Sequence, residues 1–162
     1  MSAAGARGLR VVIGLALCLG ASPARAADQP DAAMLASAGR VAAFIETGGT
    51  APLAGAFADH DVTIIENFPP YVFEGADAVA RWSAQMRTHL SGVSSLRHRF
   101  GRAYDFSRTG DEAYFSLPTT WRGLDHGKTF TEHGGWAFVL TRQAGAWRVR
   151  SYGWSVTLTS EK

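Results

Sequence analysis

The chain has 162 residues, with 16 lysines and arginines, 14 acidic residues and one cysteine, and its formal charge is +2. This length suits one domain with a sizeable core. The balanced charge argues against a nucleic-acid partner, because phosphate binding needs a clustered basic surplus, and one cysteine cannot form an internal disulfide.

The first 26 residues have the pattern of a cleavable signal peptide. Arg7 and Arg10 form a basic start, residues 11–21 are an apolar run, and Ala24-Arg25-Ala26 fits an A-x-A cleavage site. The run is shorter than the roughly 20 residues that span a bilayer, so we expect no membrane anchor after cleavage. The prediction is an exported protein, periplasmic or secreted, in which residues 27–162 form a single domain.

Removal of this leader changes the chemistry open to the mature chain. Cys18 leaves with it, so no thiol nucleophile, disulfide or thiolate metal site is expected. Three of the 16 basic residues (Arg7, Arg10 and Arg25) also leave, whereas all 14 acidic residues stay, and the formal charge becomes −1.

Three helices are predicted in the first half of the mature chain. The first covers residues 33–46, where apolar residues recur at roughly helical spacing before Gly48-Gly49 ends the pattern. The second, residues 50–58, begins with Thr50 as a cap and has Pro52 in its first turn. The third covers residues 74–90. Its apolar stripe consists of Val79, Trp82, Met86 and Leu90.

One short strand, residues 62–65, precedes the third helix and ends on a carboxylate, Glu66. A loop with three aromatic residues and two prolines, residues 67–73, follows it. From residue 94 on, apolar and polar residues alternate, which predicts four antiparallel strands joined by short turns. They cover residues 94–106, 113–121, 130–142 and 147–158, and Gly134-Gly135 predicts a bulge or a close-approach point in the third. The fold class is therefore α+β, with helices on one side of a curved sheet.

The apolar residues of the last strand change faces along its length. Trp147 and Val149 lie on one face, whereas Tyr152, Trp154, Val156 and Leu158 lie on the other. Either a bulge at Gly153 turns the strand over, or a second subunit covers the back of the sheet. Of the two, we favour a homodimer through the sheet.

The chain resembles the nuclear transport factor 2-like superfamily, which includes ketosteroid isomerases, SnoaL-like polyketide cyclases and scytalone dehydratase. The resemblance spans about residues 32–158. It rests on the segment FADHDVTIIE (residues 57–66), Glu74-Gly75, GAWRV (residues 145–149) and Trp154-Ser155. It implies a cone: a curved antiparallel sheet wraps around three N-terminal helices and leaves an apolar cavity open at one end.

The resemblance also implies a role for Glu66. Aligned without gaps, Glu66 takes the position of the general base of ketosteroid isomerases, whose oxyanion hole is a tyrosine plus a neutral aspartic acid. The same alignment puts Ala42 in place of that tyrosine, and the last two strands offer no obvious aspartic acid. Steroid isomerisation by the known mechanism is therefore not expected.

Two residues are candidates for catalysis. Burial of Glu66 behind Ile64 and Ile65 would raise its pKa towards neutrality, where a carboxyl group moves protons well; the alternative is a solvated carboxylate at a strand end. His98 stands on the apolar face of its strand, where it could pair with Glu66 as a second proton carrier. The alternative for His98 is a purely structural role.

Five aromatic residues are candidates for ligand binding. Tyr71 at the loop apex could bind a ligand at the rim or seal the core, and Phe68 could form wall or core. Trp121, Trp136 and Trp154 suit the wall of a site for a planar apolar ligand, with core or dimer contact as their alternative.

The residue patterns predict no metal and no cofactor. Glu132 and His133 are adjacent on a strand and point to opposite faces, and the sequence has no HExxH motif, nucleophile elbow or phosphate loop. We therefore expect an exported domain that binds a small apolar or aromatic carbonyl compound, and isomerises, dehydrates or cyclises it by proton transfer. The alternatives are a non-catalytic ligand-binding module and a dimerisation module whose tryptophans fill the cavity.

Overall fold

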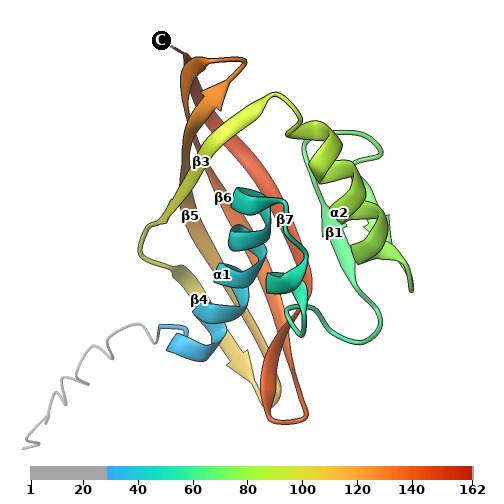
Figure 1. Ribbon diagram of the computed structural model, residues 1–162. Helices are drawn as coiled ribbons and strands as arrows, with labels where there is room; N and C mark the ends of the chain where they lie inside the picture. The colour runs from blue at the N-terminus through green and yellow to red at the C-terminus, as the bar shows by residue number, and fades with distance from the viewer. Residues whose placement is uncertain (1–28, 162) are drawn as a thin grey trace, which may run out of the picture.

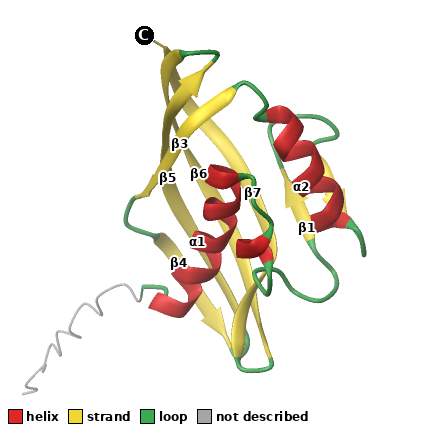
Figure 2. Ribbon diagram, viewed as in Figure 1, coloured by secondary structure: helices red, strands yellow, loops and turns green. Residues whose placement is uncertain are grey.

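The computed structural model describes residues 29–161, so the predicted signal peptide lies outside the described residues. Two helices lie against the concave side of one curved sheet (Figures 1 and 2). The elements are α1 (Ala32–Thr47), a 3-10 turn (Ala51–Leu53), β1 (Thr63–Ile65), β2 (Val72–Glu74), α2 (Ala78–His89), β3 (Val93–Phe100), β4 (Tyr104–Thr109), β5 (Glu112–Asp125), β6 (Lys128–Gln143) and β7 (Ala146–Glu161). Within the described part of the chain, no helix has the length and apolar character needed to cross a membrane.

Helix α1 matches the predicted first helix and has a signal at each end. The Asp31 side chain accepts a hydrogen bond from the Met34 amide at 2.8 Å, which caps the first turn. Gly48 adopts a left-handed φ of 67° and ends the helix. The predicted second helix, residues 50–58, is wrong: only the 3-10 turn Ala51–Leu53 forms there, so the sheet wraps around two α-helices and not three.

Helix α2 is shorter than predicted because its first residues belong to the sheet. Val72–Glu74 pairs with β1 as strand β2, and Gly75, with φ of 90°, turns the chain before the helix starts at Ala78. The apolar stripe places Trp82 and Met86 in the core, where they are 0% and 5% exposed.

The sheet has seven strands in the order β2-β1-β7-β6-β5-β3, and β4 also pairs with β5. Its longer strands are antiparallel as predicted, but β1 runs parallel to β7, so the sheet is mixed. The predicted strand 94–106 is two strands, because residues 101–103 leave the ladder between β3 and β4. The α+β class and the unclosed, curved sheet predicted for the cone are confirmed.

Two bulges in β7 explain why its apolar residues change faces. Leu140 pairs with Val149 and Val139 pairs with Ser151, so Arg150 is the extra residue of the first bulge. This bulge turns both Val149 and Tyr152 into the core, where they are 0% and 1% exposed. The reversal therefore needs no second subunit, and the bulge lies at Arg150 rather than Gly153. The other register shift, between His133 and Gly134, has Thr157 of β7 as its extra residue, so this bulge lies opposite the glycine pair and not in it. Gly134 is instead a close-approach point, because a Cβ there would lie 2.4 Å from the Ser155 carbonyl oxygen.

Candidate functional site

The strand β1 turns Glu66 into the interior. Side chains alternate along a strand, so Ile64 is buried, Ile65 is 46% exposed and the next residue, Glu66, points inward again. The Glu66 amide also donates to the Tyr71 carbonyl at 2.9 Å, which extends the β1–β2 pairing by one residue. Glu66 is 5% exposed, a burial that carboxylates rarely show without partners.

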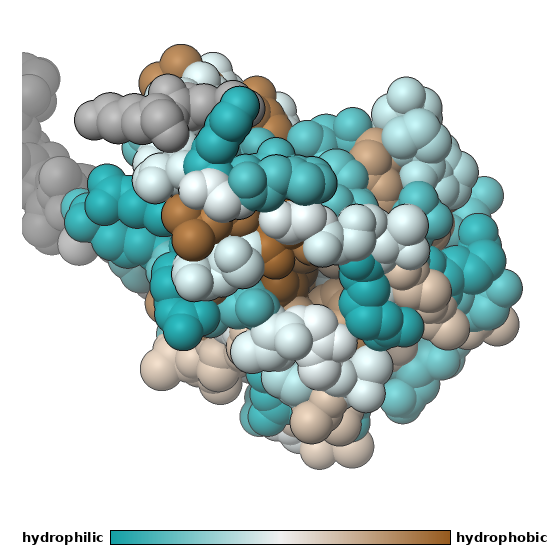
Figure 3. Space-filling view, turned by 45° about the horizontal axis from the view of Figure 1, so that its top comes forward, coloured by the Kyte–Doolittle hydropathy of each residue, from teal (hydrophilic) through white to brown (hydrophobic). Residues whose placement is uncertain are grey.

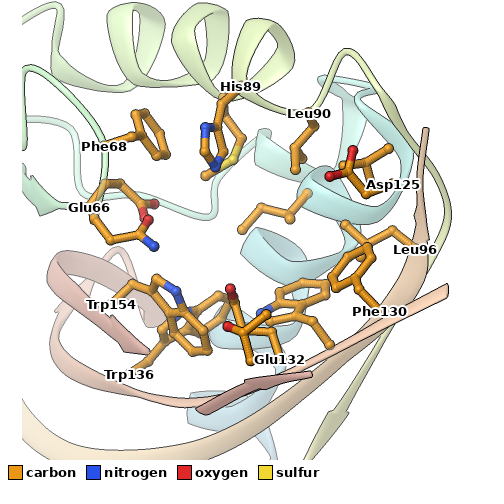
Figure 4. A pocket seen from close by; sticks show the side chains of 16 residues that line it. Glu66, Phe68, His89, Leu90, Leu96, Asp125, Phe130, Glu132, Trp136 and Trp154 are labelled. Atoms are coloured by element: carbon orange, nitrogen blue, oxygen red, sulfur yellow. The ribbon is translucent and has the colours of Figure 1, made fainter. Parts of the chain in front are cut away.

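Two donors from distant parts of the chain hold one oxygen of Glu66. Trp82 of α2 donates from Nε1 to Oε1 at 2.9 Å, and Tyr152 of β7 donates its hydroxyl to the same Oε1. Across residues 29–161, no donor lies within hydrogen-bond distance of Oε2. Oε2 is also not one of the fully buried side-chain atoms that lack a hydrogen-bond partner, so it has accessible surface. Oε2 therefore borders open space, and Glu66 stands at the wall of the cavity in Figure 4.

Burial sets the protonation of this group. The pKa of Glu66 is raised from 4.5 to about 7: desolvation by burial raises it most, the hydrogen bonds from Tyr152 and Trp82 partly offset this, and the charge of Glu132 raises it further. Burial also raises the pKa of Tyr152 well above 10, helped by the neighbouring Glu66. Tyr152 therefore remains a donor at neutral pH, while Glu66 exchanges readily between its acid and its base form.

The cavity beside Glu66 has a volume of about 240 Å³. It lies between the helices and the inner face of β5, β6 and β7. On the face shown in Figure 3, apolar side chains lie in a hollow that polar side chains surround. Sites for drug-sized ligands have about 300–1,000 Å³, so this cavity suits a smaller molecule. Of the predicted site residues it brings together Glu66, Phe68, Trp121, Trp136 and Trp154.

The three tryptophans form one aromatic wall. The ring centroid of Trp136 lies 6.1 Å from that of Trp121 and 5.8 Å from that of Trp154. Gly134 makes room for the Trp154 indole, because a Cβ at position 134 would lie 2.5 Å from a ring atom. Trp121 and Trp136 are also core residues at 5% and 2% exposure, so they serve as wall and core at once.

His89 faces the cavity and was not predicted as a site residue. It is the last residue of α2, and its ring stacks on Phe68 with centroids 4.4 Å apart and planes 21° apart. Burial lowers the pKa of His89, although Asp125 raises it, so the imidazole is neutral at pH 7. The sequence feature that could have identified His89 as a cavity residue is its spacing: it lies seven residues after Trp82 and three after Met86, on the same helix face.

Glu132 and Asp125 also line the cavity and were missed. Glu132 projects from β6, and burial raises its pKa while a hydrogen bond from the Trp154 side chain lowers it. From the sequence, Glu132 was considered only as a possible metal ligand beside His133.

The predicted pairing of His98 with Glu66 does not form, because His98 pairs with Glu46. Its Nδ1 lies 2.8 Å from Glu46 Oε1, and its backbone amide donates to the same oxygen at 2.7 Å. His98 is not among the residues that line the cavity, although its ring lies 5.5 Å from that of Trp121. Through these two contacts with Glu46, His98 connects β3 to the end of α1.

Tyr71 also lies away from the cavity lining. It is 55% exposed at the apex of the loop between β1 and β2, and so it neither lines the cavity nor seals the core.

Comparison with known proteins identifies the fold. The sequence matches no model of a known protein family, and no curated protein matches it. Hexachlorocyclohexane dehydrochlorinase LinA-type3 from Novosphingobium barchaimii superposes with a TM-score of 0.68 at 10% identity, over 81% of this chain and 88% of that one. A candidate scytalone dehydratase from Novosphingobium aromaticivorans gives 0.66 at 13% identity, over 80% and 85%.

A candidate ketosteroid isomerase from Shewanella frigidimarina gives a TM-score of 0.61 at 22% identity, over 77% of this chain and 96% of that one. The matches also include a nuclear transport factor 2-like superfamily protein from Salmonella enterica. The chain therefore has the nuclear transport factor 2-like fold, as its resemblance implied. Structural neighbours with this fold include proteins described as dehydratases, isomerases and dehydrochlorinases.

Proposed function

We propose that the protein binds a small, largely apolar carbonyl compound in this cavity and isomerises or dehydrates it without a cofactor, with Glu66 as the base. One observation carries the proposal: a 95% buried carboxyl group has one oxygen held by two donors and the other facing an aromatic-walled cavity. A purely structural glutamate would have both oxygens bound.

The protonation of Glu66 suits proton abstraction. A general base works best when its pKa lies near the working pH, and the pKa of Glu66 is about 7. Oε2 would take a proton from the carbon beside the carbonyl, and the electrons of the broken C–H bond would move onto the carbonyl oxygen. With a β,γ-unsaturated ketone, the resulting dienolate is reprotonated at its γ-carbon by the protonated Glu66. With a β-hydroxy ketone, the enolate expels the β-hydroxyl group, which takes the proton from Glu66 and leaves as water.

His89 is the group best placed to assist. Its imidazole lies on the same cavity wall as Glu66 and Phe68 in Figure 4. A neutral imidazole has one N–H donor and one acceptor, so it can donate to the carbonyl oxygen or to the leaving hydroxyl. In this proposal His89 takes the role that was predicted from the sequence for His98.

The structural neighbours support this class of reaction. Dehydration, dehydrochlorination and ketosteroid isomerisation each break a C–H bond, and all three names occur among proteins of the same fold. Because these proteins are only 10–22% identical to this chain, their substrates are not assigned to it.

The predicted export and homodimer are part of the proposal. The outer face of the sheet offers a patch of small, uncharged residues, on which Ala137 pairs with Ser116 and Gly153, and Gly135 pairs with Pro118 and Ser155. A second copy could pack closely there. Light scattering of the purified protein measures this directly, and a monomer at micromolar concentration would rule the homodimer out.

Deuterium exchange tests the reaction without knowledge of the natural substrate. Cyclohexanone, acetophenone and β-tetralone are incubated with the protein in D₂O, and deuterium at the α-carbon is followed by proton NMR. We expect exchange above the buffer rate for at least one ketone, lost in Glu66→Gln and kept in Glu74→Gln, which removes an exposed carboxylate. Ketones that shift the NMR signals of cavity residues but never exchange would favour the non-catalytic binding module.

A further inference from the structure

The charged residues of the cavity all have the same sign. Glu66, Asp125 and Glu132 line it, whereas none of its sixteen lining residues is a lysine or arginine. His89 adds no charge, because burial keeps its pKa below the ordinary value. A carboxylate or phosphate ligand would meet uncompensated repulsion here, and the cavity therefore selects against anions.

Glu132 stands among aromatic side chains in the middle of the cavity wall. On the sheet it pairs with Trp121 of β5 on one side and Thr159 of β7 on the other. The Trp154 side chain favours the ionised form of this carboxylate and so lowers its pKa, and Figure 4 shows the carboxylate beside the indole of Trp154. A carboxylate together with indole faces is the combination that binds an ammonium group, by a charge-assisted hydrogen bond and by cation–π attraction.

The buried Glu66 and the half-buried Glu132 also interact with each other. The charge of Glu132 disfavours ionisation of Glu66, so the cavity holds two acidic groups that repel when both are ionised. The only described donors to Glu66 bind Oε1, which leaves Oε2 without a positive or hydrogen-bonding partner. A cation on the ligand would supply what the described residues lack.

We propose that the ligand is an amine: its protonated nitrogen binds Glu132 between the indoles of Trp121 and Trp154, and its apolar carbonyl-bearing part extends to Oε2 of Glu66. This inference rests on the proposed function and names the substrate class of the same site. Asp125, whose side chain is 52% exposed, lies nearer solvent and attracts the same cation on its way in.

Binding and chemistry are linked in this arrangement. An ammonium group at Glu132 offsets the negative charge that disfavours ionisation of Glu66. The base form of Glu66 therefore becomes more populated when the ligand arrives, and a neutral analogue of the same shape would not produce this change.

A matched set of probes tests the inference by binding alone. The probes are 3-phenylpropylamine, 3-phenylpropanol and 3-phenylpropionate. All three have a phenyl ring on a short alkyl chain, and they differ in the charge of the end group. Isothermal titration calorimetry at pH 7.5 should rank the amine first and the carboxylate last. We expect the amine to bind at least about tenfold more tightly than the alcohol, which is about 1.4 kcal/mol.

The variant Glu132→Gln keeps the size of the side chain and its acceptor for Trp154 but removes the charge. It should lower the affinity for the amine to that for the alcohol, whereas Glu74→Gln, which makes the same change in net charge on the surface, should keep the preference for the amine. Equal binding of amine and alcohol to the unmodified protein would overturn the inference and leave the deuterium-exchange result untouched. Binding of none of the three probes would overturn it as well.

Discussion

Replacing Glu66 by glutamine should remove a destabilisation that the folded protein acquires as the pH rises. The pKa of Glu66 is about 7 in the folded protein, against 4.5 for a glutamate in water, which is the value that applies to the unfolded chain. The folded chain therefore binds this proton more tightly. The stabilisation from the bound proton is fully present below pH 4.5 and is lost as the pH rises to about 7.

The magnitude follows from the same two values. At about 1.4 kcal/mol for each tenfold change in proton affinity, the loss is about 3 kcal/mol. The neutral amide of Glu66→Gln can still accept from Trp82 and Tyr152 but does not titrate. The free energy of unfolding of the unmodified protein, minus that of the variant, should thus fall by about 3 kcal/mol between pH 4 and pH 8.

Urea denaturation of both proteins at a series of pH values measures this difference. Subtraction cancels most of the titration of Glu132, which is present in both proteins, and Glu74→Gln, which removes an exposed carboxylate, is the control for the same change in net charge. A Glu66→Gln difference that stays constant within about 0.5 kcal/mol from pH 4 to 8, or that rises, would refute the burial argument.

Three further predictions follow from single contacts. Tyr152→Phe removes a donor that stabilises the ionised Glu66; in this background the stability difference between Glu66 and Glu66→Gln should therefore stop falling only at a pH above about 7, and an unchanged end point would show that the hydroxyl does not act on the carboxylate. Gly134→Ala places a Cβ 2.4 Å from a backbone oxygen of β7 and should lower the urea-measured stability by about 1–3 kcal/mol, whereas Gly39→Ala, with open space around it, should not destabilise. Deleting Arg150 removes the bulge and should abolish cooperative unfolding, while Arg150→Ala should change stability by no more than about 0.5 kcal/mol; a well-folded deletion variant would contradict the bulge's role.

Local patterns were enough to predict the cavity wall. The position of Glu66 follows from alternation after two isoleucines, and Trp121, Trp136 and Trp154 follow from their places on alternating strands. The face change of the last strand was visible too, but alternation alone could not distinguish a bulge from a second subunit. The extra residue is Arg150, which carries no glycine signal and is defined only by the partner strand.

Local sequence patterns could not predict the hydrogen-bond partners of the polar side chains. Glu66 is bound by residues 16 and 86 positions away, and only the fold brings them together. His98 lies on the face that alternation predicted, but Glu46, 52 positions earlier, reaches its ring from the end of α1. His89 was not singled out from the sequence, and only the fold shows that it turns inward, stacks on Phe68 and stays neutral.

The asymmetric binding of the two oxygens of Glu66 has a stereochemical consequence. Because Oε1 is held by α2 on one side and by β7 on the other, the carboxyl plane cannot rotate freely, and Oε2 addresses the cavity from one fixed direction. A ligand lying against the tryptophan wall presents only one of its two prochiral hydrogens to that oxygen. Proton exchange at a methylene group should thus be enantioselective, and a reaction that creates a stereocentre should yield predominantly one hand.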